Sequence, residues 1–402
     1  MVEVIKKLQV VHDVQRAALG ELIHDAVRIA IEQAVQEELS AALGAAPYER
    51  AEVRLGYRNG TRPRKLSGPT GPLPLKVPRA TMFTTRGEEE WASKVLPRYQ
   101  RRLPEINETL VTAYLAGANT RRIKGALRPL LKDAPLSKSA ISRVVGTLKA
   151  TFDAWRTRPL DGLDVVFLYL DAFALKVRNA GKVVSLPVLA AVAVLADGAK
   201  QLVSLEMCGS ESYDAWKGFV DDLVARKLRA PILCVIDGNP GLRSAVDIVW
   251  SKAEIQRCTV HKQRNVARKT PLHAREEIAE DCRGVLYAES EAAARTAWAA
   301  FDRKWEKRCP GAVRSLAEGG DELLTYFKFP KEQWKTIRTT NVIERLNGEF
   351  RRRVKTQGSL PGEDAALVLL FSLVASGQIK LRKIDGFKRI GTVLNNRTKI
   401  AA

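Results

Sequence analysis

Three acidic residues, far apart in the sequence, occupy positions typical of ligands for divalent metal ions. Asp171 closes the apolar run VVFLYLD, Asp237 closes ILCVID, and Glu344 lies in the basic segment TTNVIERLNGEFRRR. A carboxylate at the end of an apolar strand is poorly solvated, so a cation beside it stabilises its charged form. Oxygen ligands of this kind suit Mg²⁺ or Mn²⁺. Two such ions, about 3.5–4 Å apart, can activate a water or a 3′ hydroxyl and stabilise a leaving oxygen, which predicts phosphodiester chemistry.

Each of these acids also has a purely structural explanation. Solvated aspartates at strand ends are common, and the turn DGNPGL could by itself account for Asp237. Glu349 competes with Glu344 for the third position, but it points to a different helix face and could pair with the arginines that follow it. Glu344 is favoured because its neighbours one helical turn away are small or polar, as a site requires: Thr340, Asn341, Asn347 and Gly348.

Cys258 and His261, in QRCTVHKQRN, have the C-x-x-H spacing of half a zinc site. A structural zinc is not expected, because it needs four ligands and the remaining cysteines and histidines do not pair at ligand spacing. His261 could contact a phosphate or order a metal-bound water; alternatively, both residues pack beside the site. The odd number and wide scatter of the cysteines indicate a reducing cytosol rather than a disulfide framework.

The charge of the chain points to a polyanionic partner. The 402 residues carry a formal net charge of +21, which favours nucleic acid, and less often an anionic membrane. The longest apolar run, SLPVLAAVAVLA, is too short to cross a bilayer, and the N-terminus has no signal-peptide pattern. A cytoplasmic, DNA-associated protein is therefore expected. The segment from Lys328 to Lys355 contains nine Lys or Arg residues and three acidic residues, so phosphate binding is expected around Glu344.

The order of the predicted elements indicates how Asp171 and Asp237 converge. Three apolar strands, 164–173, 182–195 and 200–208, are joined by short turns and predict an antiparallel meander. A helix (SYDAWKGFVDDLVARKL), the strand PILCVID, a helix (GLRSAVDIVW) and the strand AEIQRCTV follow. The order β-β-β-α-β-α-β is that of the ribonuclease H-like fold, an α/β class with a mixed sheet covered by helices. Its first and fourth strands are neighbours, which would bring the two aspartates together.

Five regions are expected along the chain. An amphipathic helical region, 1–50, either packs on its own domain or forms an oligomer, with Gly20 as a point where the helix could break. A DNA-binding region, 51–157, comes before the first part of the ribonuclease H-like core, 158–261. An all-helical insertion, 262–336, separates this part from 337–402, which completes the core with the Glu344 helix and a basic tail.

The DNA-binding region combines a basic β element with a helix-turn-helix. The Gly-, Pro- and Arg-rich stretch 56–86 predicts a small, irregular β element, or else a solvated basic linker; Arg58, Arg62 and Arg64 suit phosphate contact. Helices are expected at 104–117, at 120–131 and from Ser137, its N-cap. The last would enter the major groove, although structural three-helix bundles look the same. Its DNA-facing candidates are Lys138, Ser139, Ser142 and Arg143.

Several of these motifs together resemble the IS256-type, or Mutator-like, DDE transposases. YLDAFALKVR and VIDGNPGLRSAV look like the regions of the family's two catalytic aspartates, QRCTVHKQRN like its C-x-x-H signature, and TTNVIERLNGEFRRRVK like the region of its catalytic glutamate. GYRNGTRPRKL and KVPRA resemble N-terminal boxes, with Ala80 where a charged residue is expected.

The resemblance implies a homodimeric enzyme that binds the terminal inverted repeats of its element. It would cut DNA with Mg²⁺, or with Mn²⁺ in its place, and transfer the exposed 3′ hydroxyl to target DNA. Asp171, Asp237 and Glu344 would be the catalytic metal ligands. Alternatives are a ribonuclease H-like nuclease and a catalytically silent DNA-binding protein derived from a transposase. Further candidates for the neighbourhood of the site or for DNA contact are Arg264, Asn341, Arg345 and Arg351.

Overall fold

The computed structural model describes residues 2–50, 54–68, 71–103, 138–179, 181–355, 360 and 362–401. Contacts group the chain into two compact units, Met1–Gly146 and Thr147–Ala402, and the boundary between them falls within helix α5 (Lys138–Thr157). The first two helices of the predicted helix-turn-helix fall outside the described residues. Across the described ranges, no helix is both long enough and apolar enough to span a membrane.

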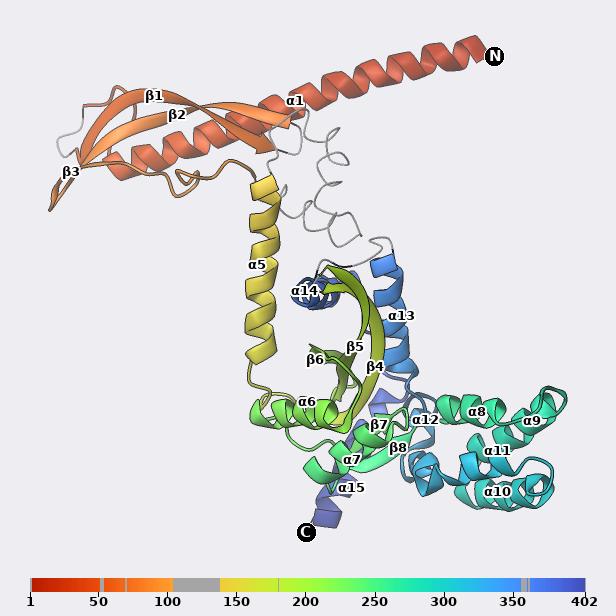
Figure 1. Ribbon diagram of the computed structural model, residues 1–402. Coiled ribbons are helices and arrows are strands. Elements are labelled where there is room, and N and C mark those ends of the chain that lie inside the picture. The colour runs from red at the N-terminus through yellow and green to blue at the C-terminus, as the bar shows by residue number, and fades with distance from the viewer. Residues whose placement is uncertain are drawn as a thin grey trace. The chain divides into compact units, whose positions relative to one another are not determined.

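The first unit packs one long helix on a three-stranded antiparallel sheet. Alternating residues of the second strand, Leu73, Leu75 and Val77, form a buried cluster with Val35 of the helix. The helix continues through Gly20, because one glycine costs only about 1 kcal/mol in a helix interior. The sheet is longer and more regular than the predicted irregular element. Its elements are α1 (Val2–Leu43), β1 (Gly56–Gly68), β2 (Gly71–Thr84) and β3 (Gly87–Glu90) (Figure 1).

The second unit is built on a mixed five-stranded sheet of order β6-β5-β4-β7-β8. The first three strands in the chain form the predicted antiparallel meander, and β7 and β8 run parallel to β4. The predicted element order is confirmed. The elements are β4 (Val165–Asn179), β5 (Lys182–Leu195), β6 (Lys200–Met207), α6 (Tyr213–Ala225), β7 (Leu233–Ile236), α7 (Pro240–Val249) and β8 (Glu254–Arg257).

The two faces of β4 pack against different helices. Leu168 and Leu170 belong to a core that includes buried residues of α6 and α7. On the opposite face, the Tyr169 hydroxyl donates to the Thr336 carbonyl oxygen over 3.3 Å, and Phe173 stacks on Phe350 at 5.7 Å between ring centroids. Phe350 belongs to α13 (Asn341–Lys355), which runs beside β4 (Figure 1). Asp171, two residues from both Tyr169 and Phe173, shares the α13 face.

The segment between β8 and α13, which the structure describes in full, is helical as predicted. It has its own buried cluster, which includes Ile278, Phe301, Trp305 and Leu316. Its α-helices are α8 (Thr259–Arg268), α9 (Arg275–Leu286), α10 (Glu291–Trp305), α11 (Pro310–Ala317) and α12 (Lys331–Ile337). After α13 come α14 (Glu363–Ala375) and α15 (Ile390–Ala401).

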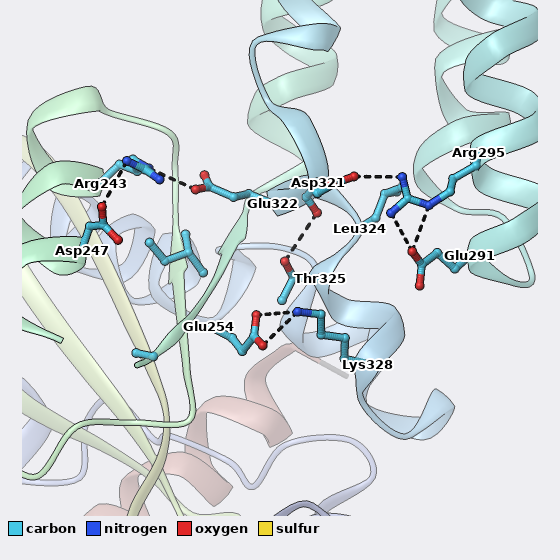
Figure 2. Close-up of a pocket in the computed structure, with 12 residues that line it drawn as sticks. Arg243, Asp247, Glu254, Glu291, Arg295, Asp321, Glu322, Leu324, Thr325 and Lys328 are labelled. Carbon is cyan, nitrogen blue, oxygen red and sulfur yellow. Dashed lines mark hydrogen bonds and ion pairs between the residues drawn. The ribbon is translucent and has the colours of Figure 1, made fainter. Parts of the chain in front are cut away.

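A polar pocket of about 330 Å³ lies where the helical segment meets the edge of the sheet. Figure 2 shows that ion pairs cross it. They join Arg243 to Glu322 at 3.0 Å, Arg295 to Asp321 at 2.9 Å and Lys328 to Glu254 at 2.8 Å.

Candidate active site

Strand register brings Asp171 and Asp237 to the same level of the sheet. Tyr169 of β4 lies opposite Val235 of the parallel strand β7. The two aspartates follow these residues by two positions each, so they lie on the same face. The sequence predicted a strand that ends at Phe173, two residues after Asp171, but β4 continues to Asn179 because its hairpin pairing with β5 continues. The parallel pairing with β7, however, ends at Tyr169.

Asp171 is the most buried of the three predicted acids, with a relative exposure of 7%. Burial, and then the negative charges of Asp237 and Glu344, raise its pKa to about 7, against the opposing effect of His261. The Asn347 amide nitrogen donates a 2.9 Å hydrogen bond to Asp171 Oδ2. Because its charge contributes to the raised pKa of Asp171, Glu344 lies close enough to interact electrostatically with that carboxylate.

Asp237 is held by the turn that follows β7. Its Oδ1 accepts a 2.9 Å hydrogen bond from the backbone of Asn239. Gly238, between them, has a φ of +105°, and a Cβ there would lie 2.7 Å from the Arg257 guanidinium. Both observations explain why glycine follows this aspartate.

A fourth carboxyl group, Glu211, lies near Asp237 and was not identified from the sequence. Burial, and then the charge of Asp237, raise the pKa of Glu211. Its Oε1 accepts hydrogen bonds from Asn239 Nδ2 at 2.9 Å and from Trp216 Nε1 at 3.3 Å. Asn347 was considered only as a small polar neighbour of Glu344. Neither residue lies in a local sequence pattern that would have revealed its interaction with an aspartate, which is electrostatic for Glu211 and a hydrogen bond for Asn347.

Glu344, in the first turn of α13, is engaged by two basic side chains. Its Oε1 lies 3.1 Å from His261 Nε2 and 3.4 Å from Arg264 Nη1. Within the described ranges, no group of three or more His, Cys, Asp or Glu side chains lies close enough to hold a metal ion. Asp171, Asp237 and Glu344 thus share one region without reaching coordination distance, and the side chain of Glu344 faces its cationic partners.

The C-x-x-H pair connects α8 to the start of α13. Thr340 donates to Cys258 Sγ from its backbone nitrogen at 3.3 Å and from its hydroxyl at 3.2 Å. A hydrogen bond with Cys258 raises the pKa of His261 to about 9, although burial opposes this. Burial alone would raise the pKa of the Cys258 thiol, but hydrogen bonds to His261 and Thr340 lower it. Cys258 and Thr340 thus surround the imidazole that contacts Glu344.

The other candidates on α13 have distinct surroundings. Asn341 and Arg345 are exposed and line a groove. The Arg351 guanidinium lies 5.9 Å from the centre of the Phe173 ring, a cation–π arrangement. Glu349, the competitor of Glu344, pairs with Arg352.

The predicted DNA contacts of the first unit remain predictions. Arg58 donates to Gln36, Ser40 and the Ala45 carbonyl oxygen, and Arg64 donates to backbone carbonyl oxygens between residues 96 and 100. Arg62 lies 3.9 Å from Glu90. The backbone of α5 places Lys138, Ser139, Ser142 and Arg143 within its first two turns.

A mixed α/β unit that gathers three acids on one face, in a chain of net charge +21, is of the class expected for enzymes acting on nucleic acid. Residues 2–381 match the family described as "Transposase, Mutator family". The chain belongs to the Mutator family of transposases, and its function is that of an insertion-sequence transposase, an enzyme that cuts and joins DNA.

Named relatives agree with this assignment. The transposase for insertion sequence element ISRM5 of Rhizobium meliloti is 35% identical over 81% of this chain and 80% of its own length. The transposase for IS406 of Burkholderia multivorans is 33% identical over 82% and 83%. Among solved structures, the Drosophila P element transposase strand transfer complex aligns with 71% of this chain and 83% of that chain, at 12% identity and a TM-score of 0.28. A likeness at that level carries no information about this fold.

Proposed function

We propose that this transposase uses a DDE mechanism, in which Asp171, Asp237 and Glu344 bind two divalent metal ions, Mg²⁺ or in its place Mn²⁺. The burial of Asp171 carries the proposal: its pKa is raised to about 7 by desolvation and by two neighbouring acids. Such a carboxylate is stabilised by a cation placed between the acids. The donor atoms are carboxylate oxygens, which fit hard divalent ions.

A second observation supports a metal-binding role for this group of residues. The amide oxygen of Asn347 is buried and has no hydrogen-bond partner among the described residues, while its nitrogen donates to Asp171. A buried acceptor of this kind is satisfied when an ordered water occupies the site. Metal ions in such a site supply an activated water or 3′ hydroxyl and stabilise the leaving oxygen.

The chain's own residues position the third carboxylate. Cys258 and Thr340 orient His261, and His261 and Arg264 hold Glu344 beside the aspartates. Release of Glu344 from these two partners would complete the ligand set. DNA phosphates that pair with Arg264 would favour that release, because they compete with Glu344 for the guanidinium.

The wider architecture of the proposal is a ribonuclease H-like core with an all-helical insertion at 262–336. The sheet order β6-β5-β4-β7-β8 and the helical segment between β8 and α13 support it. The region before the core would bind the terminal inverted repeats, and a homodimer would hold the two ends of the element together.

Asp171→Asn tests the mechanism. The variant keeps nearly the same shape and can still accept the hydrogen bond of Asn347, so we expect it to bind inverted-repeat DNA as the native chain does. Mg²⁺-dependent strand cleavage of that DNA should be lost. If the Asp171→Asn variant still cleaves the DNA, the assignment of Asp171 as a catalytic metal ligand is wrong. Cleavage of any duplex by the native chain, without preference for the repeats, would favour a nuclease instead.

A further inference from the structure

A basic groove runs along an exposed side of α13. Its volume is about 830 Å³, and its walls come from α12, α13, the start of β6 and the segment that follows α14. Four of its basic side chains form no ion pair with any residue that the structure describes: Lys200, Arg345, Lys380 and Arg382.

Positive charges lie close together in this groove. Lys200 is half-buried, and its pKa is lowered by burial and then by the charge of Arg345, with Asp385 opposing. A cation in such surroundings is stabilised by an anion that enters from solvent. The groove's other cations have acidic partners: Lys335 with Asp385 at 3.7 Å, Lys383 with Asp197 at 3.2 Å, and Arg352 with Glu349.

The pocket of Figure 2 provides a contrast within the same unit. It also has basic residues in its wall, but Arg243, Arg295 and Lys328 each have an acidic partner across the pocket or beside it. Their charges are therefore compensated inside the protein. The α13 groove differs from this pocket because four of its cations have no ion pair with any described residue.

Helix α13 connects the groove to the acids. Asn341, Arg345 and Glu349 follow one another at intervals of four residues and line the groove. Because successive residues are rotated by about 100°, Glu344 lies about 60° around the helix from Asn341 and about 100° from Arg345. Asn347 lies about 160° from Arg345, on the buried side that faces Asp171. A chain of phosphates lying in the groove would therefore pass beside the helix turn that carries the third acid.

We propose that the α13 groove binds the sugar-phosphate backbone of one DNA strand and directs it toward the three acids. Lys200, Arg345, Lys380 and Arg382 would contact its phosphates. The groove has the volume of a ligand-sized cleft, which suits one backbone rather than the whole width of a duplex. The inference rests on the proposed function, because it assigns a path for the DNA that the acids would cut.

The salt dependence of DNA binding tests this assignment. The double variant Lys380→Gln/Arg382→Gln is prepared in the full-length chain carrying Asp171→Asn, which prevents cleavage. Its affinity is measured by fluorescence anisotropy at several NaCl concentrations, for an oligonucleotide duplex and for one of its strands alone. Removal of each phosphate contact should reduce the slope of log K against log [salt] by about 0.9 for the duplex and about 0.7 for the single strand.

The matched control is Arg295→Gln/Lys328→Gln, which removes the same charge from the pocket of Figure 2 and should leave the slopes unchanged. A reduced slope for the single strand, in the groove variant alone, supports the proposal. A reduced slope for the duplex alone contradicts the assignment of the groove to a single strand. Equal slopes in the groove variant and the control contradict any binding of DNA phosphates in the groove. Arg382→Gln alone serves if the double variant does not fold. If the groove proposal is wrong, the salt slopes do not change as expected, but the native chain still cleaves DNA. If the DDE proposal is wrong, cleavage survives the substitution Asp171→Asn.

Discussion

Asn347 of α13 donates a 2.9 Å hydrogen bond to Asp171 of β4, although 176 positions separate the two residues in the chain. This bond fixes one oxygen of the buried carboxylate. The Asn347 amide oxygen, by contrast, is buried and has no hydrogen-bond partner within the part of the chain that the structure describes. Asn347 thus restrains the carboxylate of Asp171 through its amide nitrogen.

Removal of this restraint should weaken the metal site. Asn347→Ala should lower metal affinity or cleavage rate by about 10- to 100-fold, the usual cost of removing a partner of a metal ligand. Isothermal titration with Mg²⁺ or Mn²⁺ and a strand-cleavage assay would measure it. Asn341→Ala, on the exposed groove side of α13, is the control and should leave metal affinity unchanged. Equal effects of the two substitutions on metal affinity would contradict a positioning role for Asn347.

Asp171 should destabilise the metal-free protein. A rise in the pKa of its carboxyl from 3.8 to about 7 corresponds to on the order of 4 kcal/mol when the group is charged. Asp171→Asn should therefore raise the melting temperature at pH 8 in EDTA, because it removes a buried charge next to two acids. Differential scanning calorimetry would measure the change. A lower melting temperature would mean that the carboxylate is already compensated in the metal-free fold.

Metal should stabilise the native chain and not that variant. A ligand that binds only the folded state adds about 2.7 kcal/mol at a concentration 100 times its Kd. Mg²⁺ or Mn²⁺ should thus raise the melting temperature of the native protein, and EDTA should reverse the increase. If Asp171→Asn responds equally, the ion binds elsewhere.

The strands of the core could be predicted because apolar runs and the Asp197-Gly198 turn are local signals. The position of Asp237 directly after β7 could be predicted from the same order of strands and helices. The full length of β4 could not, because residues 174–179 are in a strand only through pairing with β5. The N-terminal sheet was underestimated because Pro63 and three arginines obscured β1, which lies at an edge of the sheet where a proline is tolerated. Asn347 and Glu211 were missed because their roles depend on contacts between distant segments.

Arg264 should compete with metal for Glu344. Its guanidinium lies 3.4 Å from the Glu344 carboxylate, and its charge also repels a divalent ion. Arg264→Gln should therefore tighten Mn²⁺ binding by the protein without DNA, by roughly two- to fivefold for a pair that is 55% exposed on one side. Titration calorimetry would detect it. Arg268→Gln, one helical turn further along α8, is the control, and weaker Mn²⁺ binding by Arg264→Gln would contradict the competition.

Glu344 and Glu349 can be distinguished by a pair of matched substitutions on one helix. Glu344→Gln should lower strand cleavage at least about 100-fold, since removal of a metal ligand takes away several kcal/mol of transition-state stabilisation. Glu349→Gln should retain cleavage, because Glu349 pairs with Arg352 in the wall of the groove. It should even tighten DNA binding, since it removes an acid beside the phosphate path. Rates would be measured on inverted-repeat DNA with Mg²⁺. Abolished cleavage in Glu349→Gln together with retained cleavage in Glu344→Gln would exchange the roles of the two residues.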